Sequence, residues 1–438
     1  MARKIIIHIG VFAAVMALLW GMLILTSLIP NESIQENMLK SAESYVTPDP
    51  FSFENGRKYN AVSDNYADVI LQNILWNIKS DDPFVSSLDT KYYDGGQFGV
   101  NWGNYASIKG EPANTDYTRY WHGSVIFIRP LMLVTDVKGV KLAGALAVLL
   151  LALTVCGVLV VKKQYFAAAA FTLSLICVQF YNVRLSLEYL PMANIAMLSC
   201  IGFLCLEKKG NDAMTVLSVI FGAMTAFFDF LTAETLSILL PMLLVFIVRE
   251  QENRLGTLRE NILISVKCGG CWAAAYGGTF LVKWTAATLV TGENKFEAAL
   301  TSAEERLVGA AEELPFFKQL FFAPLANLST MFGGEERVDG GKIIIGLILT
   351  ALVFGGICLL FRRRRRNKSI TIICLILGLL PYLRYMVLNN HSYLHEFFTY
   401  RAQAATVLAL CGIVWFNLKF SEPKAKPKTK KKASAESR

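Results

Sequence analysis

The chain has 438 residues, of which 54% are hydrophobic, and its mean hydropathy is +0.43. A soluble domain of this size is less apolar, so the composition excludes a soluble protein and indicates a membrane protein. The formal net charge is +9. Its basic residues lie beside apolar stretches and at the C-terminus, where they would meet anionic lipid head groups. The charge therefore predicts contact with membrane lipids and no nucleic acid partner.

About ten apolar stretches approach the roughly 20 residues that a helix needs to cross about 30 Å of hydrocarbon. They are residues 5–29, 139–161, 165–181, 191–206, 213–228, 235–248, 262–284, 341–361, 369–388 and 402–418. The first is interpreted as an uncleaved anchor, because no A-x-A-like cleavage site follows its long apolar run. The sequence thus predicts an all-α fold, a polytopic transmembrane bundle of about 10 spans.

Clusters of Lys and Arg mark one end of these stretches. They are Arg3–Lys4, Lys162–Lys163, Lys208–Lys209, Arg249–Arg259, Arg362–Lys368 and Lys424–Lys432. With ten spans, all six clusters fall on the same side of the membrane, as the positive-inside rule requires of the cytoplasmic side. We therefore expect a multi-pass protein of the plasma membrane with both termini in the cytoplasm.

This topology divides the chain into six parts. They are a first span (1–30), an extracytoplasmic segment with interfacial helices (31–138), spans two to seven (139–284), a second extracytoplasmic segment with an amphipathic helix (285–340), spans eight to ten (341–420) and a disordered basic cytoplasmic tail (421–438). Segments as long as the two outer ones are usually functional or disordered. The first has turn signals and many aromatic residues, so we expect it to be folded.

Apolar residues recur at helical spacing in both outer segments. Between Ile70 and Ile78 they predict a short helix on the membrane surface, with Ser63 or Asp64 as its cap. A second stripe runs from Phe296 to Leu314, opposite a face of Glu residues. It predicts either a helix that rests on lipid or a lid over a lipid substrate.

Carboxylates on the outer side are the first candidates for chemistry. Asp64 and Asp68 are four residues apart, so both lie on one face of a helix. One reading makes them a general base and its companion, and the other makes them a cap and a partner of the helix dipole. Asp229 lies between two Phe residues at the end of the fifth stretch. A charge at that position needs a partner or a function.

Several candidate partners for these outer acids are available. Arg184, Arg384 and Lys283 are predicted to be on the same side as Asp229, so a structural ion pair is as plausible for Asp229 as a functional role. Glu188 and Arg184 are one helical turn apart, which favours a local pair between them.

Basic and imidazole side chains gather at two outer positions. They are Arg119, His122 and Arg129 before the second stretch, and His391, His395 and Arg401 before the last. Arg binds phosphate oxygens through two parallel hydrogen bonds, so these residues are candidate ligands of a lipid phosphate or of another substrate group. Their structural alternative is an aromatic belt with Arg side chains that reach the interface.

A divalent cation is a further alternative at the last outer loop. His391 and His395 have the i, i+4 spacing of metal ligands on a helix, and Glu396 follows. The sequence offers no third ligand, so no metal or other cofactor is predicted with certainty.

This layout resembles the GT-C superfamily of membrane glycosyltransferases. The similarity lies in the number of spans, the cytoplasmic N-terminus and the long outer segments after the first and seventh spans. It implies a polyprenyl-phosphate-linked sugar as donor and an extracytoplasmic acceptor. Asp68, or Asp64, would take the acidic role of the family's first loop. Arg129, His391, His395 or Arg401 would neutralise the phosphate leaving group.

Two other functions remain open. A transporter or flippase for a lipid-linked or polar substrate is expected to carry broken helices and polar residues near mid-membrane. A non-catalytic partner in polymer assembly or export would use the outer segments to bind another protein. The polar residues here cluster at one rim, which favours an enzyme. The sequence indicates neither the sugar, the acceptor nor the oligomeric state.

Overall fold

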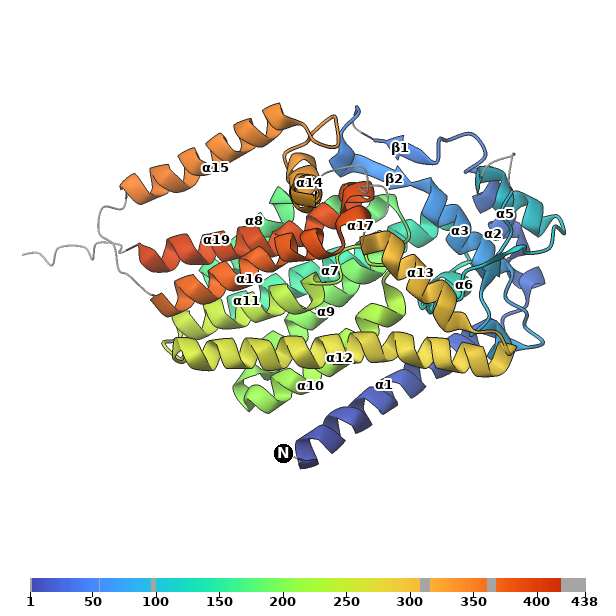
Figure 1. Ribbon diagram of the computed structural model, residues 1–438, viewed down its shortest axis with the longest axis horizontal. Coiled ribbons are helices and arrows are strands. Elements are labelled where there is room, and N and C mark those ends of the chain that lie inside the picture. Colours follow the sequence, from blue (N-terminus) through green and yellow to red (C-terminus); the bar gives the residue numbers. More distant parts are fainter. Residues whose placement is uncertain (1, 55, 96–99, 308–315, 361–367, 419–438) are drawn as a thin grey trace, which may run out of the picture.

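The computed structural model describes residues 2–54, 56–95, 100–307, 316–360 and 368–418, and their architecture is mainly helical (Figure 1). In this part of the chain, seven helical runs are long and apolar enough to cross a membrane. They are α1 (Ala2–Ser27), α7 (Val137–Val161), α9 with its terminal 3-10 turn (Tyr189–Lys209), α10 (Asn211–Phe228), α15 (Gly340–Leu360), α16 (Lys368–Val387) and the run Glu396–Asn417 that ends in α19 (Ala404–Asn417). The predicted, mainly helical architecture is therefore confirmed, and its apolar helices are consistent with a membrane protein.

The three remaining predicted spans are also helical, but they differ in length or polarity. Helix α8 (Tyr165–Cys177) has 13 residues and α11 (Leu236–Gln251) has 16, so neither alone spans the roughly 30 Å of a hydrocarbon core. Helix α12 (Leu258–Thr291) has 34 residues and carries Lys267 and Lys283 within its length. The count of ten spans thus stays a prediction.

The bundle is built around α11. Its residues from Leu236 to Val248 are all buried, and α9, α10, α16 and α19 pack against it. At the periphery, α15 stands apart from the other long helices (Figure 1), and most of its described side chains are exposed. Such an apolar, unburied surface is what lipid tails solvate.

Ion pairs bring several of the basic clusters to one end of the bundle, here called the basic end. Buried Glu207, at the end of α9, lies 4.0 Å from Lys162 Nζ, 3.4 Å from Arg249 Nε and 2.8 Å from Arg254 Nη2. At the same end of the neighbouring helices, Lys4 Nζ is 2.8 Å from Asp212 Oδ1. The common sidedness of these clusters is a feature of the fold, and their cytoplasmic location stays a prediction.

The two long segments lie at the opposite end, here called the loop end (Figure 1). The described residues of the first form five α-helices, a 3-10 helix (Tyr59–Ala61) and two small antiparallel sheets. They are α2 (Asn31–Glu43), α3 (Asn65–Trp76), α4 (Pro83–Ser86), α5 (Val100–Ile108), α6 (Val125–Leu131), strands β1 (Phe51–Phe53) and β2 (Val62–Asp64), and strands β3 (Lys91–Tyr92) and β4 (Thr115–Asp116). Register pairs Phe51 with Asp64 and Lys91 with Asp116.

Helix α3 forms where the apolar spacing predicts it, and Asp64 is its cap, because Ala67 N donates to Asp64 Oδ1 at 2.8 Å. Its location differs from the expected membrane surface. Ile74 and Leu75 are buried, but so is Gln72 on the polar side. Because α2 and α5 cover it, α3 is the core of a folded segment.

The second long segment supplies α13 (Lys295–Leu307) and α14 (Phe316–Met331). Helix α13 packs against α12 and α17 (Asn389–Leu394), and α14 packs against α16, α17 and α18 (Glu396–Thr399). The end of the predicted apolar stripe, around Leu314, and the predicted tail 421–438 are outside the described residues. The described part of α13 therefore lies against α12 and α17 at the loop end.

Candidate functional site: a carboxyl pair and three histidines in one cavity

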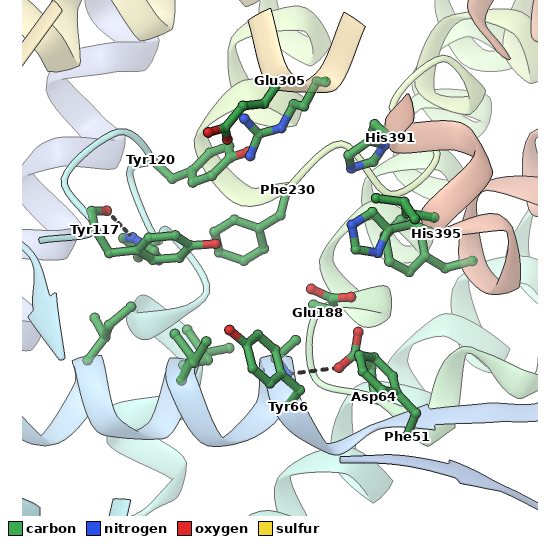
Figure 2. A pocket seen from close by; sticks show the side chains of 18 of the residues that line it. Phe51, Asp64, Tyr66, Tyr117, Tyr120, Glu188, Phe230, Glu305, His391 and His395 are labelled. Carbon is green, nitrogen blue, oxygen red and sulfur yellow. Dashed lines mark hydrogen bonds between the residues drawn. The ribbon is translucent and has the colours of Figure 1, made fainter. Parts of the chain in front are cut away.

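A cavity of about 310 Å³ opens at the loop end of the bundle (Figure 2). Its walls come from both long segments, from the turns beside α9 and α10, and from α17. The polar side chains that line it include Asp64, Tyr117, His122, Glu188, Arg306, His391 and His395. Four predicted candidates, Asp64, His122, His391 and His395, are therefore brought together in one cavity.

The floor of the cavity carries a pair of carboxyl groups. Asp64 caps α3 and Glu188 precedes α9, and their side chains point toward one another (Figure 2). The two carboxyls are close enough to affect each other's pKa, and a hydrogen bond between them requires one of them to hold a proton. Burial raises the pKa of Asp64 to about 7 and raises that of Glu188 well above its usual value. Asp64 is thus the member that ionises near neutral pH.

Glu188 is a site residue that the sequence reading assigned elsewhere. The local pair with Arg184 does not form, because Arg184 is exposed while Glu188 is buried. The Oε1 atom of Glu188 has no hydrogen-bond partner among the described residues. A buried oxygen without a partner is costly, so this atom is available to a ligand.

Three imidazoles line the same cavity as the carboxyl pair. His391 and His395 are one helical turn apart, with ring centroids separated by 4.8 Å, and His395 stacks on Phe398. His122 has a φ of 53° and shares a 2.9 Å hydrogen bond between Nε2 and Tyr117 O. The Nδ1 atom of each ring is buried without a partner in the described part of the chain.

Burial keeps these rings neutral at physiological pH. It lowers the pKa of His122 to about 3 and that of His395 to about 4, and it lowers that of His391 well below its usual value. A neutral imidazole has one donor and one acceptor nitrogen. The three rings are therefore suited to hydrogen bonds with an uncharged polar ligand and not to holding a phosphate by charge.

Positive charge at the cavity comes from two arginines instead. Arg306 of α13 donates from Nη2 to Tyr120 Oη at 2.7 Å, and its Cζ lies 5.7 Å from the Tyr120 ring centroid. Arg119 Cζ lies 5.5 Å from the same ring and 4.1 Å from that of Tyr117. Neither guanidinium forms an ion pair within the described ranges. Tyr120 thus separates two cations that lack an acidic partner.

A groove of about 150 Å³ adjoins the cavity at these arginines. Tyr120 and Arg306 line both spaces, and Arg119 lines the groove. Its other wall is aromatic and follows α12 through Tyr276, Phe280 and Trp284. The aromatic groove, the two guanidiniums and the polar cavity therefore lie next to one another. The sequence did not predict Arg306 as a site residue, because it follows Glu residues in a pattern typical of an exposed helix face.

Asp68 lies outside the cavity, in a network that joins the first long segment to the bundle. Its Oδ1 accepts hydrogen bonds from Ser186 Oγ and Leu187 N, each at 2.7 Å, and Oδ2 lies 2.5 Å from Lys141 Nζ and accepts from Tyr45 Oη at 2.9 Å. All its oxygens are satisfied and the residue has no exposed surface. Of the two predicted carboxylates, Asp64 therefore lines the cavity and Asp68 does not.

Three other candidates also lie away from the cavity. Arg129 is buried and donates to Ile29 O, Leu75 O and Asn31 Oδ1, so its donors are occupied by the chain. Asp229 accepts from Thr232 N at 3.1 Å and from the Thr232 hydroxyl. Arg401 is 3% exposed, and its Cζ lies 4.6 Å from the Tyr189 ring.

Arg384, a predicted partner of Asp229, forms its ion pair with Glu234 instead. Arg384 Nε is 2.8 Å from Glu234 Oε1, and Arg384 also donates to Ser392 Oγ at 2.7 Å. It therefore links the α10–α11 turn to α17, which carries His391. The other candidate, Lys283, donates to Ser87 O and Leu88 O.

The described residues contain no group of three or more His, Cys, Asp or Glu side chains placed to hold a metal ion. His391 and His395 therefore do not find the third ligand that a divalent cation would need. No step that follows depends on a metal.

No protein-family model, curated protein or solved structure matches the chain.

Proposed function

We propose that this protein is a membrane glycosyltransferase that moves a sugar from a polyprenyl-phosphate donor to an extracytoplasmic acceptor. The observation that carries the proposal is the Asp64–Glu188 carboxyl pair in a cavity that Arg306 also lines, with Arg119 in the adjoining groove. Such a transfer needs a base for the acceptor hydroxyl and cations for the phosphate leaving group. Both requirements are met by side chains at the same end of the bundle.

Asp64 is the base in this proposal. Its pKa of about 7 suits proton transfer at neutral pH, where a base must be ionised in part and still attract a proton. Protonated Glu188 donates a hydrogen bond to the Asp64 carboxylate and so fixes its orientation. The acidic role implied by the resemblance to the GT-C superfamily thus falls on Asp64.

Arg119 and Arg306 bind the phosphate. The acceptor oxygen attacks the anomeric carbon and forms the new glycosidic bond, and its proton passes to Asp64. The bond from that carbon to the phosphate oxygen breaks, and the polyprenyl phosphate leaves with the electron pair. The two guanidiniums stabilise the charge that develops on it. The lipid tail then lies along the aromatic groove of α12.

The neutral imidazoles bind the sugar. Each of His122, His391 and His395 has a buried Nδ1 atom without a partner among the described residues. A sugar hydroxyl both donates and accepts hydrogen bonds, so it satisfies either tautomer. These contacts would orient the anomeric carbon toward Asp64.

The position of the cavity favours an enzyme over a transporter. A transporter binds its substrate near the midplane, between helices that are broken there. Here the cavity is lined by α3, α13 and α17, which lie at one end of the bundle (Figure 1). The substrate would therefore be processed at the membrane surface.

The test uses the purified full chain in lipid nanodiscs with a radiolabelled polyprenyl-phosphate hexose, and measures release of polyprenyl phosphate. Asp64→Asn should reduce the rate by about 100-fold or more, because it removes a base while Asn still caps α3. Asp81→Asn, at an exposed position of the same segment, is the matched control and should keep full activity. A folded Asp64→Asn protein that releases the lipid as fast as the wild type rejects the proposal.

A further inference from the structure

A second cavity, of about 450 Å³, is lined by the connection between β1 and β2. Strand β2 links the two cavities: Asp64 at its end lines the first cavity, and Ala61, just before its start, lines the second. The remaining walls come from the 3-10 helix Phe180–Leu185, the end of α14 and the start of α15. The proposed transfer makes no use of this space.

The charge of the second cavity is positive. Lys58, Arg184 and Lys342 line it, against one carboxylate, Glu54. Among the described residues, Lys58 and Arg184 have no ion-pair partner, and Lys342 Nζ is 3.9 Å from Glu335 in a pair between exposed groups. A pair of that kind contributes little. The cations are thus available to an anion.

The polar floor of the cavity is held in place. Asn60 is 6% exposed and lines the cavity, and its side-chain amide makes no hydrogen bond within the described ranges. Its backbone oxygen accepts from Asn182 Nδ2 at 2.9 Å and from Tyr400 Oη at 3.2 Å, which fixes the residue. Gly333, with a φ of +76°, packs close to the Asn60 amide. The amide nitrogen is therefore a placed donor that lacks an acceptor.

We propose that this second cavity binds a phosphate group. Three basic side chains and one buried amide donor form the set of groups that recognises a tetrahedral anion. The group can be the head of an anionic lipid or belong to a soluble phosphate-bearing ligand. Both sources are consistent with the location, because Lys342 lies in the first turn of the lipid-exposed helix α15.

The experiment measures both sources on the full chain. Equilibrium dialysis of the detergent-purified protein against radiolabelled orthophosphate reports the soluble group. Native mass spectrometry after equilibration with phosphatidylglycerol, and separately with phosphatidylcholine, reports the lipid. The variants are Arg184→Glu and Lys58→Glu. Lys138→Glu is the matched control, because it makes the same charge change at an exposed loop-end position outside the cavity.

Wild type and Lys138→Glu should bind orthophosphate, or retain phosphatidylglycerol in preference to phosphatidylcholine. Arg184→Glu and Lys58→Glu should each weaken that binding by about tenfold or more. Orthophosphate binding assigns the site to a soluble ligand, and retention of phosphatidylglycerol alone assigns it to a lipid. Binding of neither, or equal binding by all variants, overturns the proposal. Asp64→Asn should bind like wild type, so the result is independent of the proposed transfer.

Discussion

The carboxyl groups of Asp64 and Glu188 point toward one another in one cavity although the two residues belong to different parts of the fold. Asp64 starts α3 in the first long segment, and Glu188 precedes α9 in the bundle. Near neutral pH Asp64 loses its proton while Glu188 keeps its own. The loss from Asp64 creates the carboxylate that the proposed transfer needs, which links the activity to pH.

Activity should rise with pH and level off above about 7. The reason is that Asp64, whose pKa burial raises to about 7, accepts the acceptor proton only when ionised. The histidines should not contribute to this rise of activity with pH, because burial lowers the pKa of His395 to about 4 and that of His122 to about 3. Initial rates between pH 5 and pH 9 test this expectation. A rate independent of pH would remove Asp64 from the mechanism.

Substitution of Glu188 should shift the rising limb of the pH–activity profile, the pH range over which activity increases, in a predictable direction. The hydrogen bond from Glu188 lowers the pKa of Asp64 against the effect of burial. Glu188→Gln keeps a donor, so the limb should stay near its wild-type position. Glu188→Ala removes the donor, so the limb should shift to higher pH. The same pH series on both variants makes the comparison, and a shift to lower pH in Glu188→Ala would contradict that hydrogen bond.

Asp64→Asn should also stabilise the fold at alkaline pH. The folded state binds more protons than the unfolded state between the usual Asp pKa of 3.8 and the folded pKa of about 7, so stability falls as pH rises through this window. Asn cannot ionise and still caps α3. Its unfolding midpoint should exceed that of wild type by a few degrees at pH 8. At pH 4 the two midpoints should agree.

The two arginines that line the groove beside the cavity should control donor binding. Arg119→Ala or Arg306→Ala should raise the KM for the polyprenyl-phosphate donor by about tenfold, since each removes a charge-assisted contact to phosphate. Arg306→Lys should recover only part of it, because Lys cannot bind two phosphate oxygens in a plane. Lys79→Ala, at an exposed position of the first long segment, is the control. An unchanged KM in both Arg variants would place the phosphate elsewhere.

The role of Asp68 should appear in stability. Asp68→Asn leaves Lys141, which is 18% exposed, without its partner, and should lower the free energy of unfolding by about 3 kcal/mol. Joint replacement with Lys141→Met should recover part of this loss, because no charge is then left unpaired. Thermal unfolding in one detergent gives the comparison. Equal stability of Asp68→Asn and wild type would contradict the network.

Local sequence patterns predicted the features that depend only on residues close together in the chain. Apolar runs predicted the helices of the bundle, and the spacing after Asp64 predicted both α3 and its cap. The choice between Asp64 and Asp68 was beyond the sequence, because it depends on Lys141 and Ser186, which reach Asp68 from distant parts of the chain. A helical face shows which residues point the same way, but not what packs against them.

The same dependence on tertiary packing explains why the sequence did not predict Glu188 and Arg306 as site residues. Glu188 read as a partner of Arg184 because both lie within one helical turn, yet the chain there is a 3-10 helix followed by an extended Ser186. That geometry exposes Arg184 and turns Glu188 inward. Arg306 enters the site only because α13 packs beside α17. Both depend on tertiary packing that hydropathy does not encode.

The orientation of the bundle gives a final prediction, because the loop end should face away from the cytoplasm. Single cysteines would replace Lys79 at the loop end and Lys208 at the basic end, both exposed, in a protein whose exposed Cys205 is changed to Ser. A membrane-impermeant maleimide should label position 79 in intact cells and position 208 only after permeabilisation. The positive-inside rule gives this result, since Lys208 lies in the cluster around Glu207. The opposite pattern would turn the Asp64–Glu188 cavity toward the cytoplasm and exclude an extracytoplasmic acceptor.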